Sequence, residues 1–178
     1  MDATLRQIII VAMTKMIGPQ LSFIASEPIW SKISPQCKQE LYNTSFNLIV
    51  QTDEKIKQAG AQLVANVFLA DKLSENTWQT QIIQCLTENS LHQDQGIQRA
   101  SIYSLNFICE AIQENPKVRL SQVEIDELLF SIFSGLKMAN PLILDFLKAS
   151  KYSSKFIVEQ MTNEKISDFV FETLVHLI

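Results

Sequence analysis

The sequence predicts an all-α fold built from stacked pairs of antiparallel helices. Three observations support this prediction. Glycine and proline are scarce, with four and five among 178 residues, which favours long helices over a turn-rich β-fold. Apolar residues recur at intervals of three and four, as expected for helices with one buried face. Finally, a pattern of helical segments repeats along the chain.

The repeat is clearest where two Asp-led segments are aligned. Residues 53–59 (DEKIKQA) match residues 94–100 (DQGIQRA) at an offset of 41 residues, and the apolar positions that follow stay in step. A partial third copy starts at Asp2. Aspartate is a favoured helix N-cap because its carboxylate accepts hydrogen bonds from free backbone amides. Each copy is therefore predicted to be the second helix of a hairpin.

The first helices of the hairpins lie between these copies. Pro35 suits the first position of a helix that Ser34 caps, and Ser121 with Glu124 forms a capping-box pattern. Two helices in roughly 40–47 residues indicate a HEAT or armadillo repeat, with little room for the third armadillo helix. We expect a HEAT-repeat α-solenoid, a right-handed superhelix of antiparallel helix pairs; a non-repetitive helical bundle is the alternative. The single array would comprise a second helix at about 2–17, repeats at 35–70, 76–112 and 121–159, and a further first helix at 164–178.

Composition argues against several classes of protein. The net charge of −4 disfavours a general nucleic-acid surface, which needs clustered Lys and Arg. No segment approaches the roughly 20 apolar residues of a membrane span. The three cysteines, Cys37, Cys85 and Cys109, fit neither a disulfide framework nor a zinc site, so buried free thiols are expected.

Catalysis is not expected either. His92 and His176 have no Cys or carboxylate at a metal-site or triad spacing, and the sequence has no Gly-rich phosphate loop. Acidic residues such as Glu124 and Asp126 lie at a predicted helix start, where the helix dipole explains them. We therefore predict no catalytic, metal or cofactor-binding residues and a binding scaffold rather than an enzyme.

Four segments carry an ordered series of motifs along the predicted repeats: Trp30 to Leu41, 74–83, 97–110 and 126–137. In this order they resemble the N-terminal HEAT repeats of the importin-β (karyopherin-β) family. Trp30 to Leu41 resembles the opening of the second repeat, 74–83 and 97–110 resemble the third, and 126–137 resemble the repeat that follows. Ser104 to Glu110 lies where the family reads small-Ile-Gly-Tyr-Ile-Cys-Gln. The resemblance extends from about Leu5 to Lys137 and fades beyond Pro141.

The resemblance implies the N-terminal part of a nuclear transport receptor. In this family the second helices line the concave face, and the GTP-bound form of Ran binds there on the first few repeats. Importin-α or cargo and nucleoporins bind mostly through later repeats, which this chain lacks. The implied location is the cytoplasm and nucleus, with the nuclear envelope and pore. The alternative is a structural HEAT scaffold, of the phosphatase-scaffold or vesicle-coat type, that ignores Ran.

If the second helices line a groove, their polar stripes would contact the partner. Spacings of three and four keep the residues of each stripe on one helix face. The alternative is an ordinary solvated face. The candidate Ran-contacting residues are Gln7, Thr14, Gln58, Gln62, Asn66, Arg99, Tyr103, Asn106 and Glu110.

Large aromatic residues are expected to belong to the core. Trp30 and Trp78 begin apolar stripes, so packing between hairpins is favoured over a role as ligand anchors. The same reasoning predicts core positions for six phenylalanines: Phe23, Phe46, Phe68, Phe107, Phe130 and Phe133.

The two ends of the sequence suggest part of a longer solenoid. The first predicted helix is a second helix, with no first helix to cover Ile8 to Ile10, and the sequence ends in the apolar run Leu174 to Ile178. Solenoids need polar capping repeats because each repeat buries its faces on its neighbours. We therefore expect apolar patches at both ends and self-association that depends on concentration.

Overall fold

Every element in the described residues is an α-helix. The computed structural model describes residues 12–13, 29–51, 53–73, 78–115, 117–138 and 153–177, and none of these lies in a β-strand. Residues 153–160 are helical as well. The remaining helices are α2 (Ile29–Lys32), α3 (Pro35–Ile49), α4 (Glu54–Leu73), α5 (Trp78–Ser90), α6 (Gln95–Glu114), α7 (Gln122–Met138) and α9 (Glu164–Leu177). The prediction of an all-α fold is confirmed.

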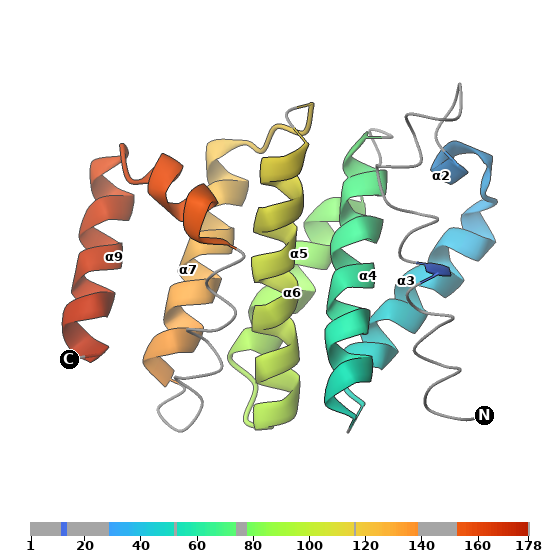
Figure 1. Ribbon diagram of the computed structural model, residues 1–178, viewed down its shortest axis with the longest axis horizontal. Helices are drawn as coiled ribbons and strands as arrows, with labels where there is room; N and C mark the ends of the chain where they lie inside the picture. The colour runs from blue at the N-terminus through green and yellow to red at the C-terminus, as the bar shows by residue number, and fades with distance from the viewer. Residues whose placement is uncertain are drawn as a thin grey trace.

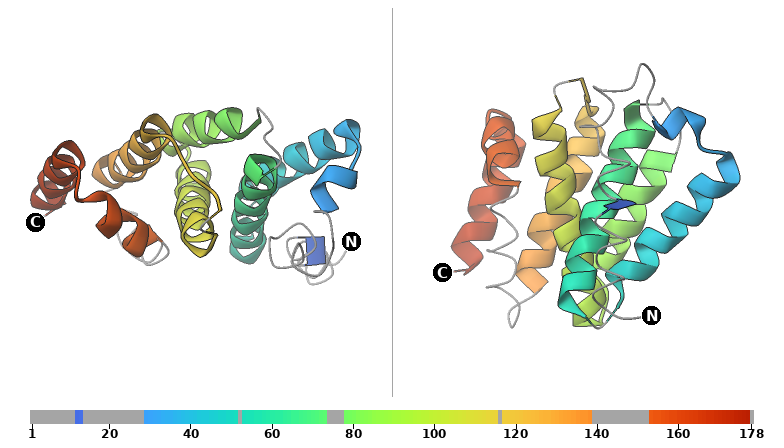
Figure 2. Two further views of the ribbon diagram at one scale, coloured as in Figure 1. Left: turned by 90° about the horizontal axis from the view of Figure 1, so that it is seen from above. Right: turned by 45° about the vertical axis from the view of Figure 1, so that its right-hand side comes forward.

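The helices stand side by side in two layers (Figure 1). Seen from above, α3, α5, α7 and α9 form an outer layer that bows away from an inner layer of α4, α6 and residues 153–160 (Figure 2). Within the layers α4 packs on α6, α5 packs on α7, and α7 packs on α9. Successive hairpins thus stack along one axis, which is the arrangement of a helical-repeat solenoid.

Side-chain caps fix where most of the helices begin. Ser34 Oγ accepts from the Cys37 amide at 3.3 Å, and Pro35 occupies the start of α3. Asp53 Oδ1 accepts from the Lys55 and Ile56 amides at 2.9 and 3.2 Å. Each cap satisfies backbone donors that have no partner within the helix, which contributes about 1 kcal/mol per cap. The predicted starts of α3 and α4 are therefore confirmed.

One apolar cluster runs through the described part of the array. Its fully buried members come from the helices of both layers. They include Ile49, Leu63, Phe68, Ile82, Leu86, Leu105, Ile108 and Leu128. Burying a side chain of this size contributes roughly 1.5–3 kcal/mol, so this cluster supplies most of the favourable free energy of folding. No helix in the described part has the length and hydrophobicity that a membrane crossing requires.

Helix ends differ from the predicted ranges more than helix starts do. The helix α4 continues to Leu73 and α6 to Glu114, beyond the expected ends at 70 and 112. The expected helix at 2–17 lies outside the described residues except for Ala12 and Met13, which are helical. Within the expected repeat at 121–159, residues 139–152 lie outside the described residues. The division of the chain into repeats stays a prediction.

Several core predictions are confirmed, whereas those for Phe130 and for two of the cysteines are not. Trp30, Phe68, Phe107 and Phe133 are buried and Phe46 is half-buried, whereas Phe23 and the side chain of Trp78 lie outside the described residues. Phe130, however, is 55% exposed. Among the cysteines, only Cys109 is buried; Cys85 is half-buried and Cys37 is exposed in the first turn of α3. Apolar spacing identifies a helix face but does not show whether a neighbour covers it.

Candidate partner-binding face

The exposed side of α4 carries the predicted polar stripe of that helix. Gln58 and Gln62 are exposed, and Asn66 is half-buried. Both glutamines lie two residues from Gly60, which faces Leu48 and Ile49 of α3. Because a helix turns about 100° per residue, these glutamines project from the side of α4 opposite α3. The stripe therefore lies on the side of the inner layer that faces away from the outer layer.

The corresponding stripe of α6 is more enclosed. Arg99, Tyr103 and Glu110 are half-buried, and Tyr103 packs against the apolar core. The Nε atom of Arg99 is buried. We use the name inner face for the described candidate residues that retain exposure: Gln58, Gln62, Asn66, Arg99, Tyr103 and Glu110. Gln7 and Thr14 lie outside the described residues.

Asn106 is buried and does not lie on the inner face, although helical spacing predicts it on the polar stripe of α6. Its side chain is 1% exposed. The Nδ2 atom donates to the Ile102 carbonyl at 2.8 Å, and the Oδ1 atom accepts from the Ser153 hydroxyl. Residues 153–160 thus pack over this part of α6. The amide satisfies its polar atoms internally, as burial requires, and joins two neighbouring helices of the inner layer.

The N-terminal ends of α4 and α6 lie at the same end of the inner layer. Asp94 Oδ1 accepts from the Gly96 and Ile97 amides at 2.8 and 3.1 Å. These hydrogen bonds, with smaller contributions from His92 and Lys57, lower the pKa of the Asp94 carboxyl. A Cβ atom at Gly96 would lie 3.1 Å from Lys57 Nζ of α4. The cap of α6 is therefore an ionised carboxylate beside a cation of its neighbour.

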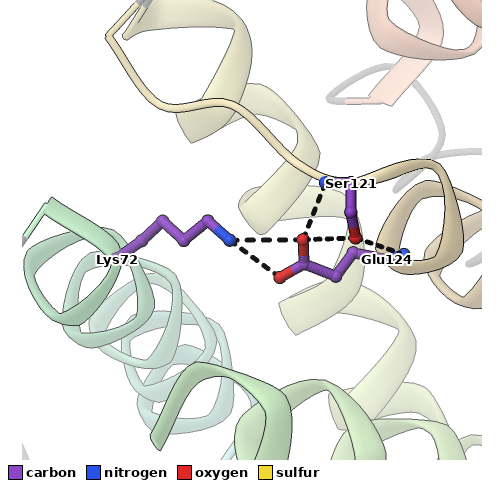
Figure 3. A network of polar contacts seen from close by, with 3 residues as sticks. All are labelled: Lys72, Ser121 and Glu124. Carbon is purple, nitrogen blue, oxygen red and sulfur yellow. Dashed lines mark hydrogen bonds and ion pairs between the residues drawn. The ribbon is translucent and has the colours of Figure 1, made fainter. Parts of the chain in front are cut away.

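A second charged contact joins the far end of α4 to α7 (Figure 3). Lys72 Nζ lies 2.9 and 3.2 Å from the two carboxylate oxygens of Glu124, and both side chains are largely buried. Glu124 also accepts from the Ser121 amide at 2.7 Å and from its hydroxyl at 2.8 Å. Burial would raise the pKa of Glu124, but the hydrogen bonds from Lys72 and Ser121 outweigh it and lower that pKa. The predicted capping box is confirmed, and Lys72 extends it.

An apolar cavity opens on the outer layer between α5, α7 and α9. Its volume is about 360 Å³, and Leu129, Phe130, Ile166 and Phe169 line most of it. Phe130 and Phe169 stack with ring centroids 5.4 Å apart, and Phe133 meets Phe169 edge-on at 6.0 Å. The exposed Phe130 thus gains an aromatic partner without being covered. Sequence analysis missed this cavity because periodicity alone placed Phe130 in the core.

Histidine, cysteine and acidic side chains are the groups that bind metals or act as nucleophiles in proteins. No three His, Cys, Asp or Glu side chains within the described residues come together as metal ligands. His92 Nδ1 accepts from the Asp94 amide at 2.9 Å, a local loop contact. Burial raises the pKa of the Cys109 thiol, which disfavours the reactive thiolate.

Two curated proteins are similar to this chain over most of its length. Importin subunit beta-1 of Schizosaccharomyces pombe is 21% identical over 151 residues, which are 83% of this chain and 17% of that protein. Importin subunit beta-1 of Saccharomyces cerevisiae is 23% identical over 149 residues, which are 81% of this chain and 17% of that protein. No family model matches the chain, and no solved structure gives a significant match.

These matches indicate a distant similarity to importin-β-type transport receptors. The chain spans about one sixth of the length of the two relatives, since each match covers 17% of the relative. The described residues of this chain form a helical-repeat solenoid.

Proposed function

We propose that this chain is part of an importin-β-like nuclear transport receptor and binds Ran-GTP on its inner face. The observation that carries the proposal is the similarity to importin subunit beta-1 over more than four-fifths of the chain. The solenoid supports it, because α4 and α6 lie side by side and α4 keeps polar side chains exposed. In this proposal the chain is a binding scaffold and not an enzyme. Importin-α or cargo and nucleoporins would bind regions beyond it, and the protein would move between cytoplasm and nucleus through the nuclear pore.

The contact residues follow from exposure. Gln58 and Gln62 can reach a partner without rearrangement, with Asn66 beside them. Arg99, Tyr103 and Glu110 would contribute their exposed parts at the neighbouring helix. Polar side chains around a partly exposed aromatic are suited to orienting and anchoring a protein partner. Gln7 and Thr14 belong to the same proposal as residues of the first predicted helix.

Nucleotide dependence tests the proposal directly. The chain is immobilised, and binding of Ran loaded with GDP or with a non-hydrolysable GTP analogue is measured by biolayer interferometry. We expect binding of the GTP form and little binding of the GDP form. Equal binding of both forms, or of neither, would favour the structural scaffold alternative.

A pair of matched variants tests the location of the interface. Gln58→Arg with Gln62→Arg should weaken binding of the GTP form by on the order of tenfold, because two long cations would disrupt a packed interface. Gln36→Arg with Gln39→Arg makes the same change at exposed positions on α3 and should have no effect. An equal loss in both variants would place the contact elsewhere.

A second variant extends the test to α6. Arg99→Glu with Tyr103→Ala should also weaken binding. Both side chains are half-buried rather than exposed as predicted, so this variant is compared with wild type by circular dichroism and thermal unfolding. Unchanged binding by a folded variant would exclude α6 from the interface.

A further inference from the structure

A hollow separate from the inner face lies where the inner layer meets the connection between α6 and α7. Its volume is about 410 Å³. The C-terminal turns of α6, residues 118–125 and the helical residues 153–160 surround it. Three buried apolar side chains form part of its lining: Ile112, Val118 and Phe156.

Two exposed cations also line the hollow. Arg119 lies on the connection between α6 and α7, and Lys155 lies on the helical residues 153–160. Neither side chain forms an ion pair or hydrogen bond with another residue in the described part of the chain. Glu159 follows Lys155 by one helical turn, but its carboxylate accepts from Gln113 Nε2 at 2.6 Å instead. The hollow thus combines buried apolar side chains with two positive charges that have no ion-pair partner among the described residues.

Charge complementarity identifies the kind of occupant. A carboxylate can bind the guanidinium of Arg119 with two hydrogen bonds, and a second can approach the ammonium of Lys155. The carboxylate of Glu159 repels anions on the side of Gln113, so acidic groups would favour the side of Arg119 and Lys155. The apolar lining requires a hydrophobic group next to those acids.

We propose that this hollow binds a short protein segment in which one large apolar side chain is flanked by aspartate or glutamate. Its volume lies near the lower end of the range for ligand pockets, which suits a single side chain and its adjoining backbone. A long alkyl chain with an acidic head would leave much of its tail in water, at a cost of about 0.8 kcal/mol per unburied CH₂. The proposal concerns a second site and does not depend on Ran binding.

An NMR titration of the isotopically labelled chain tests the proposal. The probe is the acetylated, amidated pentapeptide Glu-Glu-Phe-Glu-Glu. Glu-Glu-Ala-Glu-Glu tests the apolar requirement, and Lys-Lys-Phe-Lys-Lys tests the charge requirement. We expect saturable shifts of the amides at 117–120 and 153–160 with the first peptide. Both control peptides should bind at least roughly tenfold more weakly. Equal binding of either control, or shifts centred elsewhere, would overturn the proposal.

Charge reversal at the two cations completes the test. Arg119→Glu with Lys155→Glu should weaken binding of Glu-Glu-Phe-Glu-Glu by roughly tenfold or more, since attraction becomes repulsion at both positions. Lys55→Glu with Lys165→Glu gives the same change in net charge at exposed positions that do not line the hollow and should bind as wild type does. Equal affinity in the two variants would overturn the proposal. Dodecanoate is titrated in parallel; displacement of the peptide by a lower concentration of dodecanoate would show that the occupant is an amphiphile, contrary to the proposal.

Discussion

Glu124 combines a local role with a long-range one. It closes the capping box at the start of α7 through Ser121 and pairs with Lys72 from the last turn of α4. Because both charged side chains are mostly buried, the pair is shielded from solvent and each partner depends on the other. Removing one charge from such a pair leaves the other charge poorly solvated. The resulting loss of stability is larger than the stability that the intact pair gains over a pair of apolar residues.

Substituting Glu124 should therefore lower stability measurably. Glu124→Gln keeps the shape of the side chain but removes its charge. We expect a loss of about 1–2 kcal/mol in the free energy of unfolding, from the weakened cap and the unpaired Lys72. Urea denaturation at neutral pH measures it. Glu127→Gln, exposed on the same helix, is the control and should change stability by less than about 0.5 kcal/mol.

The loss of stability in Glu124→Gln should also depend on pH, and the lowered pKa of Glu124 determines the direction of this dependence. A carboxyl with a lower pKa in the folded state contributes stability above its unfolded pKa, which is near 4.5 for glutamate. That contribution disappears as pH falls through the lower, folded-state pKa. The stability difference between wild type and Glu124→Gln should therefore shrink below about pH 4. A difference that stays constant down to pH 3 would contradict the role of the ionised carboxylate.

The contacts of some side chains can be predicted from the neighbouring sequence, whereas those of others cannot. Ser121 and Glu124 were predictable as a capping box because three residues separate them. Lys72 was not, since 52 residues separate it from Glu124 and only folding brings them together. Helical spacing predicts Asn106 on the same stripe as Arg99 and Tyr103, but Ser153 supplies its side chain with a buried hydrogen-bond partner. Four of the six inner-face residues are half-buried, which the pattern of a single helix cannot show.

At the scale of elements, the crossing of α3 and α4 depends on Gly60. A Cβ atom at this position would lie 2.7 Å from Leu48 Cβ and 3.1 Å from the Leu48 carbonyl carbon. Such contacts are shorter than van der Waals packing allows, and one of the opposing atoms belongs to the backbone. The absence of a side chain at Gly60 therefore lets the two helices of this hairpin approach closely.

Gly60→Ala should destabilise the protein although alanine is the better helix former. The gain in helix propensity is about 1 kcal/mol, whereas forcing the two helices apart costs roughly 1–3 kcal/mol. We expect a net loss of about 1 kcal/mol, measured by thermal and urea unfolding. Gly96→Ala is the matched control, because the atoms nearest its Cβ are the side-chain ends of Asp94 and Lys57, which can move. A stabilised Gly60→Ala variant would show that the crossing adapts freely.

Helix starts were more predictable than helix ends, for a physical reason. Short-range caps such as Ser34, Asp53 and Asp94 define the starts, and their partners lie within three residues. The ends of α4 and α6 carry no glycine stop signal, so packing on neighbouring helices determines how far they extend. That packing depends on the whole array and not on the local sequence.

At the scale of the whole molecule, α9 leaves an apolar side uncovered. Ile166 and Val170 are buried against the array, whereas Phe171, Leu174 and Val175 are between 42% and 72% exposed. Exposed groups of large apolar side chains favour association between molecules. The exposed apolar side chains of α9 therefore support the predicted self-association.

Sedimentation velocity tests this prediction. The wild-type chain should show an average sedimentation coefficient that rises with concentration. Phe171→Glu with Val175→Glu should suppress the rise. Val123→Glu, another exposed apolar position but on α7, is the control and should behave as wild type does. A wild-type chain that stays monomeric at high concentration would show that the α9 surface does not drive association.

The contact between Lys72 and Glu124 also couples two hairpins that are not immediate neighbours. In an ideal solenoid each hairpin contacts only its immediate neighbours, so local unfolding at one end need not disturb a hairpin two positions away. Lys72 belongs to the hairpin of α3 and α4, and Glu124 to the helix that follows the hairpin of α5 and α6. The ion pair therefore spans the intervening hairpin (Figure 3). The ion pair therefore restricts bending of the array in one direction. Bending that separates the last turn of α4 from the first turn of α7 must break the ion pair, whereas bending in the opposite direction leaves it intact.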